Sequence, residues 1–293
     1  MHFVYIASTA TLPCSPTRRS DGFEHDRMMD ELHAGAPASV IWHDIAWDDE
    51  TADWSRFDAA IIGTAWDYWD KQDAFLSKLD DIAQQTRLFN PPELVKWNIH
   101  KSYLREMEAR GARLIPTVWL EAPNPQAVSA AFDTLESDDI VLKRQVGAGA
   151  DGQHRLKPGA PVPHMPHPMM AQPFLKAILE EGEFSFIFID GVFSHALVKR
   201  AAKGDYRIQS SYGGTDHPVT PPPADLAAAR AMLDAVETPD GQPPLYARVD
   251  MLRAPDGGLL LMEVEIIEPF LYPLEGPGLG RRMADALIKR VAP

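Results

Sequence analysis

The chain has 293 residues and a net charge of −14, with 45% hydrophobic and 24% charged side chains. This length predicts two or three modules, and the composition is typical of a folded protein rather than a disordered one. The acidic balance argues against a nucleic-acid-binding surface, which needs a basic patch, but it allows small anionic ligands held by a few local cations. The single cysteine, Cys14, excludes an internal disulfide framework and indicates a reducing compartment.

The N-terminal residues lack the basic start and long apolar stretch of a signal peptide, and they are typical of a first buried strand. No apolar run approaches the length of a membrane span. We therefore predict a cytoplasmic protein that binds neither membranes nor nucleic acids. A homodimer is compatible with these features.

Residues 1–95 alternate short apolar runs with segments of helical periodicity. The predicted strands are Phe3–Ala7, Ser39–Trp42 and Ala59–Ile62, and the predicted helices are Asp26–His33 and Ala74–Gln85. This alternation favours a small parallel α/β module, whose ligand edge lies at the C-terminal ends of its strands. The segment Gly63–Trp69 follows the third strand and would lie on that edge.

Residues 96–172 form a second predicted module. Its predicted elements are a helix at Asn98–Arg110 that Gly111 ends, a helix near Gln126–Leu135 and a strand at Ile140–Lys143. A glycine-rich loop, Gln145–Gln153, follows that strand. The proline-rich passage 158–173 is short and contains apolar residues, so we expect a connection that ends in a strand.

Residues 173–293 have a β-rich texture and form the third predicted module. The predicted strands are Glu183–Asp190, Val192–Val198, Leu245–Leu252 and Leu259–Ile267, with helices at Pro223–Val236 and Gly280–Val291. Asp190 and Gly191 are typical of a hairpin turn between the first two strands.

Acidic residues recur at alternate positions on the last two predicted strands. Residues i and i+2 of a strand share a face, so Arg248 should point with Asp250, and Glu263 with Glu265. The turn-forming residues 254–258 would pair the two strands antiparallel and bring three carboxylates and one guanidinium together. Buried acids of this kind are typical ligands of a hard divalent cation. A solvent-facing polar strip is the alternative.

Three further segments suit a nucleotide, although each has an ordinary alternative. Lys143 ends an apolar strand before the glycine-rich loop, a combination that suits phosphate, but the Walker A ending is absent and such a loop is more often a turn. Residues 172–175 with Glu183 could hold adenine and ribose, or could be a linker followed by a surface acid. The basic run 199–214 could be a lid that closes over phosphates, or a solvated turn.

The order of these features resembles the ATP-grasp superfamily, in which two α+β modules sandwich ATP. The resemblance covers about residues 96–293, and its strongest elements are Arg248-Val249-Asp250 with Glu263-Val264-Glu265, and the glycine-ended loop 204–214. That loop is similar to the one in glutathione synthetase and in the glutamate ligases that modify a ribosomal protein. The whole chain is most similar to the branch that contains the D-cycloserine-forming ligase. The segments that carry this last similarity are Thr64–Tyr68, Asn90–Leu104 and Glu265–Pro269.

The resemblance implies an α/β and α+β, ATP-grasp architecture with an N-terminal parallel α/β module, and it implies roles for individual residues. Lys101 and Lys143 would contact the ATP phosphates. The expected adenine-hinge residues are Gln172, Phe174 and Leu175, and Glu183 would hold the ribose. Lys199 and Arg207 would face the γ-phosphate or the substrate, and Arg248 would steady the charge on the activated carboxylate. The implied ligands of Mg²⁺, with Mn²⁺ as an alternative, are Asp250, Glu263 and Glu265.

Two site assignments stay open at this point. Many family members have Asn where this chain has Glu265, so either Glu265 or Glu268 could complete the metal site. The N-terminal module helps to hold the acceptor in such ligases, which makes Trp66, Asp67 and Tyr68 candidate contacts to a small, amino-acid-like substrate; both aromatic residues could instead be core anchors.

The implied reaction is the ATP- and Mg²⁺-dependent ligation of a carboxylate to an amine, or to another nitrogen nucleophile, through an acyl phosphate. Intramolecular ring closure and intermolecular ligation are both open. The alternatives are a nucleotide-binding sensor or scaffold without turnover, and a phosphotransferase that releases a stable phosphoryl product.

Overall fold

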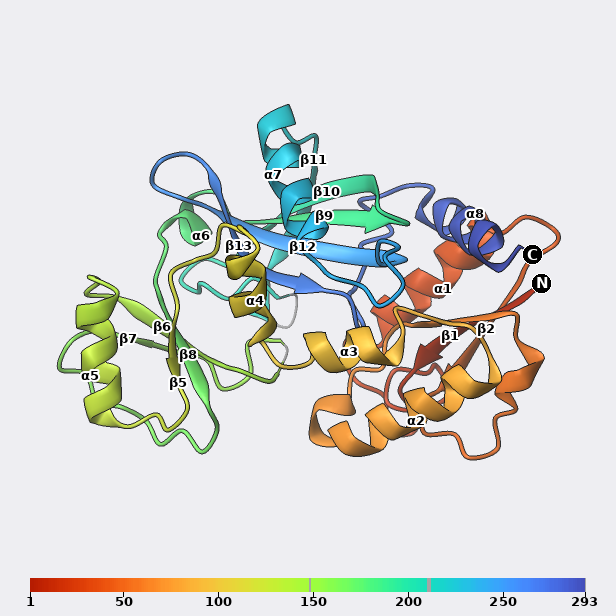
Figure 1. Cartoon of the computed structure of the whole chain (residues 1–293), viewed down its shortest axis with the longest axis horizontal. Coiled ribbons are helices and arrows are strands. Elements are labelled where there is room, and N and C mark those ends of the chain that lie inside the picture. The colour runs from red at the N-terminus through yellow and green to blue at the C-terminus, as the bar shows by residue number, and fades with distance from the viewer. Residues whose placement is uncertain (148, 210–211, 293) are drawn as a thin grey trace.

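Three β-sheets organise the computed structural model of the chain, which describes residues 1–147, 149–209 and 212–292 (Figure 1). Ala148 of the glycine-rich loop, Ser210 and Ser211 of the basic run and the terminal Pro293 lie outside the described residues. The central sheet ends at Pro173, one residue beyond the boundary expected from the sequence texture. The expected combination of α/β and α+β architecture is confirmed.

The N-terminal sheet is parallel and has the strand order β2-β1-β3-β4. Its strands are β1 (His2–Ala7), β2 (Ile41–Ala46), β3 (Ala59–Ile62) and β4 (Leu88–Phe89). The second strand starts two residues later than expected, because Val40 donates its backbone N–H to Pro37 and so closes a turn before the strand. The helices of this region are α1 (Phe23–Gly35), α2 (Gln72–Gln85) and α3 (Pro92–Asn98), with short 3₁₀ turns at Trp54–Arg56 and Tyr68–Asp70.

The C-terminal helix α8 (Leu279–Val291) packs against α1, so the end of the chain returns to the N-terminal sheet (Figure 1). Two glycines allow the close approach. A Cβ on Gly280 would lie 1.9 Å from the carbonyl oxygen of Glu31, and one on Gly35 would lie 2.2 Å from the backbone nitrogen of Arg281. Any larger residue would force these two helices apart.

The prediction of a single helix over Asn98–Arg110 is wrong. Helix α3 ends at Asn98, and α4 (Tyr103–Ala109) begins after a turn that contains Lys101. Tertiary hydrogen bonds explain the break: the Asn98 side chain donates to the carbonyl oxygen of Val264, and the Lys101 backbone N–H donates to that of Gln145. Lys101 is therefore presented from a turn and not from a helix.

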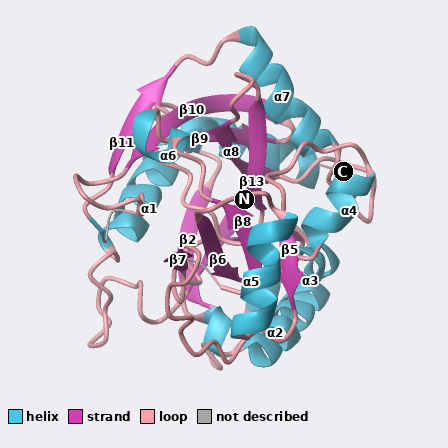
Figure 2. Ribbon diagram, turned by 90° about the vertical axis from the view of Figure 1, so that its left-hand side faces the viewer, coloured by secondary structure: helices cyan, strands magenta, loops and turns pink. Residues whose placement is uncertain are grey.

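The central sheet is antiparallel, with the order β5-β8-β6-β7, and α5 packs against it (Figure 2). Its elements are β5 (Val118–Leu120), α5 (Pro125–Thr134), β6 (Ile140–Arg144), β7 (His154–Leu156) and β8 (Met169–Pro173). Asn124 caps α5, since its side-chain oxygen accepts hydrogen bonds from the backbone N–H groups of Gln126 and Ala127. The expected strand at the end of the proline-rich passage is confirmed as β8.

The C-terminal sheet has five antiparallel strands in the order β11-β10-β9-β12-β13. These are β9 (Glu183–Ile189), β10 (Val192–Arg200), β11 (Thr215–Val219), β12 (Tyr246–Arg253) and β13 (Leu259–Glu265), with helices α6 (Ala177–Glu180) and α7 (Pro223–Asp234). The expected hairpin is confirmed: Asp190 and Gly191 both have positive φ (50° and 71°), as a tight turn between twisted strands requires.

Side-chain hydrogen bonds fix the N-terminal sheet to β12 and β13. Asn90, just after β4, has φ 57° and donates from its amide to the carbonyl oxygens of Tyr246 and Ile266. The Tyr246 hydroxyl accepts from the backbone N–H of Ile62 and donates to the carbonyl of Ile267. The C-terminal ends of the parallel strands therefore hold a fixed position relative to the acidic strands.

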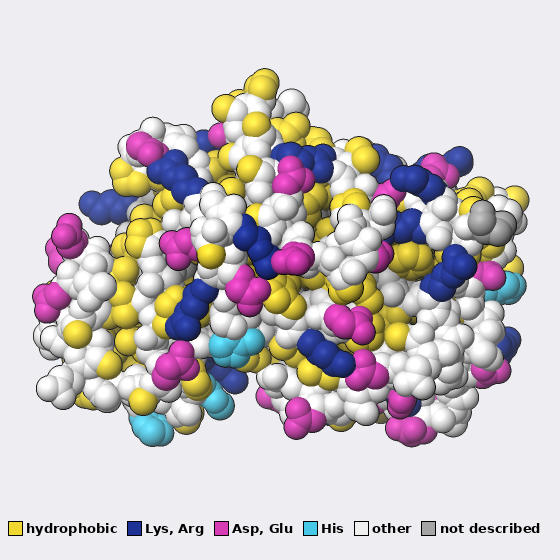
Figure 3. Space-filling model, in the orientation of Figure 1, with side chains coloured by type: hydrophobic (Ala, Val, Ile, Leu, Met, Phe, Trp, Pro, Cys, Tyr) yellow, Lys and Arg dark blue, Asp and Glu magenta, His cyan; other side chains and the backbone are white. Residues whose placement is uncertain are grey.

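In the part of the chain that the structure describes, no helix is long and apolar enough to cross a membrane. On the face shown in Figure 3, lysine and arginine side chains are interspersed with acidic ones and do not gather in one basic patch.

Candidate active site

An acidic cluster forms where β12 and β13 pair. Asp250 on β12 lies opposite Glu263 on β13, and Arg248 lies opposite Glu265. One carboxylate oxygen from each of the three acids lies within 4.8 Å of the others. Asp250 is almost fully buried, whereas the two glutamates are partly exposed. The alternation of residues along the two strands has thus placed the three predicted acids on one patch.

Cations surround this cluster. The Nε of Arg248 lies 3.0 Å from Asp250, and its guanidinium also pairs with Glu265. Lys199 extends from the end of β10, where its Nζ lies 2.8 Å from Glu183 and 3.4 Å from Asp250. The hydroxyl of Ser185, a residue that sequence reasoning missed, donates to Asp250 over 2.5 Å.

Lys101 connects the acidic cluster to the glycine-rich loop. Its Nζ lies 2.9 Å from a Glu263 carboxylate oxygen and donates to the backbone carbonyl of Gly147 over 3.2 Å. Gly147, Gly149 and Gly152 have positive φ, which explains why this loop needs glycine at those positions. A phosphate that approached this loop would meet Lys101 beside it.

The pKa values of the acids diverge within this small space. Burial alone would raise the pKa of Glu263, but the adjacent Lys101 ammonium overcomes this and holds it at about 2. Burial raises the pKa of Glu265 to about 7, with Arg248 opposing the shift and Glu263 and Asp250 adding to it. Burial and the Glu265 charge raise the pKa of Glu268 to about 8. The raised pKa values of Glu265 and Glu268 mean that the neighbouring cations do not fully stabilise the ionised form of these two acids. A site that accepts a further positive charge is expected to have this property.

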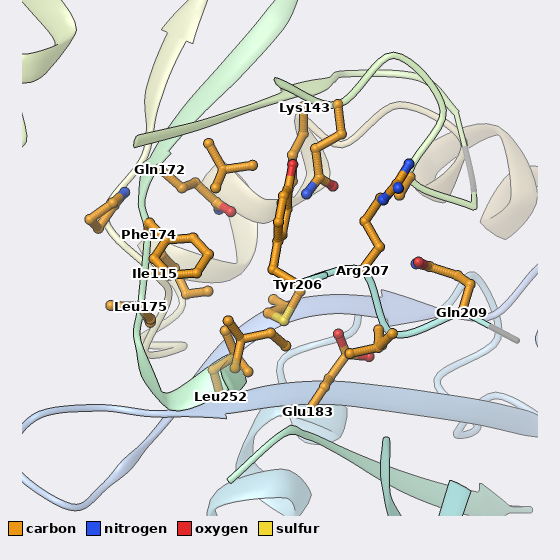
Figure 4. Close-up of a pocket in the computed structure, with 17 residues that line it drawn as sticks. Ile115, Lys143, Gln172, Phe174, Leu175, Glu183, Tyr206, Arg207, Gln209 and Leu252 are labelled. Atoms are coloured by element: carbon orange, nitrogen blue, oxygen red, sulfur yellow. The ribbon is translucent and has the colours of Figure 1, made fainter. Parts of the chain in front are cut away.

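A pocket of about 510 Å³, counted out to its open mouth, lies between the central and C-terminal sheets. It contains six predicted residues: Lys143, Gln172, Phe174, Leu175, Glu183 and Arg207. Figure 4 shows Phe174 and Leu175 on one side, Arg207 and Gln209 on the other, and Tyr206 between them. Sequence reasoning missed several apolar residues of the lining, among them Ile115, Val141, Ile178, Leu252 and Met262.

Lys143 is one of two cations that line this pocket, and Arg207 is the other. Within residues 1–147, 149–209 and 212–292 Lys143 forms no ion pair, although Glu263 and Glu183 are close enough to influence it. Burial lowers its pKa, and Lys101 adds to that effect while the two acids oppose it. A desolvated ammonium without a carboxylate partner favours an anionic ligand.

One wall of the pocket is a stack of flat side chains. The guanidinium carbon of Arg155 lies 3.4 Å from the centroid of the Phe174 ring, and that ring meets Tyr206 edge to face at 5.7 Å. Asp139 pairs with Arg155 over 2.7 Å and holds it in place. Arg155 was not predicted, and no local motif could have indicated it.

The basic run is divided between two environments. Lys199 and Arg200 belong to β10 and not to a loop, whereas Arg207 lies on the segment that follows and lines the pocket. Arg207 pairs with Asp205 over 2.7 Å, and its guanidinium carbon lies 3.7 Å from the Tyr212 ring centroid.

The segment after β3 lies next to Glu268. Trp66 donates from its indole Nε1 to the backbone carbonyl of Glu268 over 3.0 Å, and the buried Tyr68 hydrogen-bonds the Glu268 side chain. Asp67 points elsewhere, because its carboxylate accepts from Trp47 Nε1 at 2.8 Å and pairs with Lys71 at 2.9 Å.

Several known proteins are similar to this chain in sequence and in fold. Residues 4–90 match the family of the N-terminal domain of D-cycloserine synthetase DcsG. The cycloserine biosynthesis protein DcsG of Streptomyces lavendulae is 29% identical over 263 residues, a match that covers 84% of this chain and 88% of that protein. The crystal structure of D-cycloserine synthetase DcsG superposes with a TM-score of 0.81 at 25% identity, over 99% of this chain and 100% of that one.

The chain is similar to D-cycloserine synthetase DcsG over almost its whole length.

More distant structures share the fold of this chain. D-alanine–D-alanine ligase from Bacillus anthracis, complexed with ATP, superposes with a TM-score of 0.64 at 14% identity, over 99% of this chain and 97% of that one. The ATP-grasp ligase PsnB, complexed with a minimal precursor, superposes with a TM-score of 0.63 at 15% identity, over 98% of each chain. The predicted resemblance to the superfamily and to its D-cycloserine branch is confirmed, and the family match on residues 4–90 includes the Trp66–Tyr68 segment.

Proposed function

We propose that this chain is a ligase that uses ATP and Mg²⁺ to convert the carboxylate of a small, amino-acid-like substrate into an acyl phosphate, which a nitrogen nucleophile then attacks. The observation that carries the proposal is the continuity of two sites. Glu183 lines the pocket that holds Lys143 and also pairs with Lys199, which in turn reaches Asp250 in the acidic cluster. A ligand that filled the pocket would have its polar end next to the three acids.

The pocket suits a nucleotide in its chemistry, because cofactor pockets combine apolar walls with a few polar groups. On this proposal, adenine lies against Phe174, Leu175 and the apolar lining, beside the backbone of residues 172–175. Glu183 holds the ribose. Its carboxylate then accepts hydrogen bonds from the ribose hydroxyls while it remains paired with Lys199. Lys143, Lys101 and Arg207 contact the phosphates.

The acidic cluster fits a divalent cation, with Mg²⁺ or Mn²⁺ held by Asp250, Glu263 and Glu265. Glu265 rather than Glu268 belongs to the group whose oxygens converge, so we assign Glu265 as the third ligand and place Glu268, with Trp66 and Tyr68, on the substrate side. When bound, the cation would neutralise part of the charge on the triphosphate and on the transferring phosphoryl group. Within the described residues, the neighbouring Lys101 and Arg248 are placed to balance the remaining acid charge.

The reaction then needs two displacements. A carboxylate oxygen of the substrate attacks the γ-phosphorus, the bond to the bridging oxygen of ADP breaks, and the acyl phosphate forms. The nitrogen nucleophile next attacks the acyl carbon, loses its proton, and the carbon–oxygen bond breaks to release phosphate. Arg248 and Lys199 offset the repulsion between the two anions of the first step, and their burial strengthens that effect. On the same proposal, residues 1–95, 96–172 and 173–293 serve as substrate module, lid and metal-bearing module.

The proposal is tested by incubating the ligase with ATP, Mg²⁺ and pooled amino acids, with and without hydroxylamine. We expect ADP and free phosphate in equal amounts, and an acyl hydroxamate when hydroxylamine intercepts the acyl phosphate. ADP without free phosphate would instead indicate a phosphotransferase, and the absence of nucleotide turnover with every pool would indicate a nucleotide-binding sensor.

A further inference from the structure

The segment Glu268–Tyr272, which follows β13, is held from several directions by side chains of other elements. Its carbonyl groups at 268, 270 and 271 accept hydrogen bonds from Trp66 Nε1 (3.0 Å), Arg248 Nη1 (3.0 Å) and His195 Nε2 (2.9 Å). The donors come from the N-terminal module, from β12 and from β10. A loop fixed in this way presents its side chains in a set direction.

Three aromatic rings form a row along this segment. Trp66 meets Phe270 edge to face with ring centroids 6.4 Å apart, and Phe270 meets Tyr272 at 4.9 Å. All three are partly exposed, so they are not fully absorbed into a core. The row begins at the substrate edge of the N-terminal sheet and ends beside the acidic cluster.

Tyr272 occupies the end of the row that faces the reacting groups. Its ring centroid lies 5.5 Å from Lys199 Nζ and 5.6 Å from the Arg248 guanidinium carbon. These are the two cations that, in the proposed reaction, offset the charges of the carboxylate and the phosphate. Its φ is 50°, a left-handed conformation that a bulky residue rarely adopts, and Pro273 follows it. Strain of this kind persists where the surroundings hold a residue in place, and it is concentrated at functional sites.

We propose that Tyr272 is a specificity-determining residue whose ring closes the carboxylate end of the substrate site and limits the length of the side chain that fits there. The proposal rests on the function proposed above, because it takes Lys199 and Arg248 to mark where the carboxylate is activated. The ring occupies one side of both cations, and Trp66 and Phe270 extend that wall toward the N-terminal sheet. Short amino acids therefore fit, and each added methylene meets the aromatic wall.

The test measures binding, so that it does not depend on turnover. The probes are glycine and both enantiomers of alanine, 2-aminobutyrate and norvaline, each with a nonhydrolysable ATP analogue and Mg²⁺. Dissociation constants come from ligand-induced thermal stabilisation. We expect the wild type to prefer the shorter amino acids of one enantiomeric series. Tyr272→Ala should raise the relative affinity for norvaline over alanine by about tenfold or more, since one methylene in a pocket changes discrimination by about 10-fold to 200-fold.

Two controls separate the wall from general disturbance of the loop. Leu274→Ala removes a side chain that is 65% exposed on the same loop and should leave the preference unchanged, as should Tyr272→Phe, which keeps the ring. A third variant, Gly276→Ala, retains Tyr272 but should displace the loop, because a Cβ at this position would lie 2.2 Å from the His195 ring. This displacement should relax the length preference.

An unchanged length preference in Tyr272→Ala would overturn the inference, as would a wild type that binds none of these amino acids or binds all of them equally. Failure of the proposed function has a different signature. In that case the wild type would show the expected length preference in binding but would release no phosphate with any amino acid that it binds.

Discussion

The two halves of the site handle charge in opposite ways. In the acidic cluster every predicted charged group has an internal partner: Lys199 pairs with Glu183 and Asp250, Arg248 with Asp250 and Glu265, and Lys101 with Glu263. In the adjoining pocket, Lys143 forms no ion pair among the described residues and is surrounded largely by apolar side chains.

This difference indicates what each region contributes before any ligand arrives. The acidic cluster is preorganised, because buried charges that hold one another need little rearrangement when charge develops in a transition state. The pocket is left incomplete, with a desolvated cation that an anionic ligand would satisfy. Substitutions in the cluster should therefore chiefly reduce turnover, whereas substitutions in the pocket should chiefly weaken ligand binding.

The largest effect is expected at the metal-binding acids. Asp250→Asn and Glu263→Gln should each reduce turnover by about 10³-fold, since loss of a group that stabilises transition-state charge costs factors of that order. Circular dichroism should show an unchanged fold, and steady-state phosphate release measures the loss. Asp256→Asn is the matched control, because Asp256 lies in the exposed turn between β12 and β13 and pairs with Arg113. Near-normal rates in either cluster variant would remove the metal-site assignment.

The next effect concerns the stability of the loop behind the cluster. His195 is buried, its Nε2 hydrogen-bonds the Leu271 carbonyl, and burial lowers its pKa to about 4. Because the unfolded chain protonates this imidazole near pH 6.5 and the folded chain only near pH 4, the folded state binds fewer protons between these values. The free energy of unfolding should therefore fall as the pH decreases from 6.5 to 4, by about 3 kcal/mol at most from this group.

Urea unfolding at pH 7 and pH 5 measures this loss. His195→Gln should weaken the pH dependence, while His217→Gln, at an exposed position on β11, should leave it as it is. An equal pH dependence in wild type and His195→Gln would show that other groups control acid stability.

In the pocket, Lys143→Ala should weaken binding of an ATP analogue by about 10-fold to 100-fold, because hydrogen bonds to charged groups contribute about 1.5–3 kcal/mol. Fold stability should be unchanged or higher, since the substitution removes a partly buried charge that forms no ion pair among the described residues. Isothermal titration calorimetry measures the affinity, and Lys157→Ala on the exposed side of the same module is the control. Unchanged affinity would contradict the phosphate-binding role and, with it, the contrast between the two regions.

The sequence predicts a region well when the residues in contact lie close together along the chain. Arg248, Asp250, Glu263 and Glu265 lie on two strands joined by one turn, so the two-residue period of a strand was enough to bring them together. The ion pair between Lys199 and Glu183 depends on the pairing of β10 with β9, and the sequence offered only a basic run there.

The pocket could be predicted less completely. Lys143 and Gln172 sit on neighbouring strands and were marked by local motifs, whereas Ile115, Leu252 and Met262 converge from distant segments and are ordinary apolar residues in the sequence. Helical periodicity continues through Lys101 and predicts a helix there. The structure has a turn instead, in which the Lys101 backbone N–H donates to Gln145 and the Asn98 side chain donates to Val264.

The smallest effect is expected at the stacked wall of the pocket, and it tests whether that wall holds a flat ring. Arg155→Met keeps most of the length of the side chain but removes the cation that lies over Phe174, a contact that contributes about 0.5–2 kcal/mol. We expect ATP-analogue affinity to fall by a few-fold while the affinity for inorganic triphosphate stays constant, because the wall lies among the apolar lining and not at the charged end. An equal loss of affinity for the ATP analogue and for inorganic triphosphate would show that Arg155 acts on the phosphates. The apolar pocket and the charged cluster would then not contribute to binding independently.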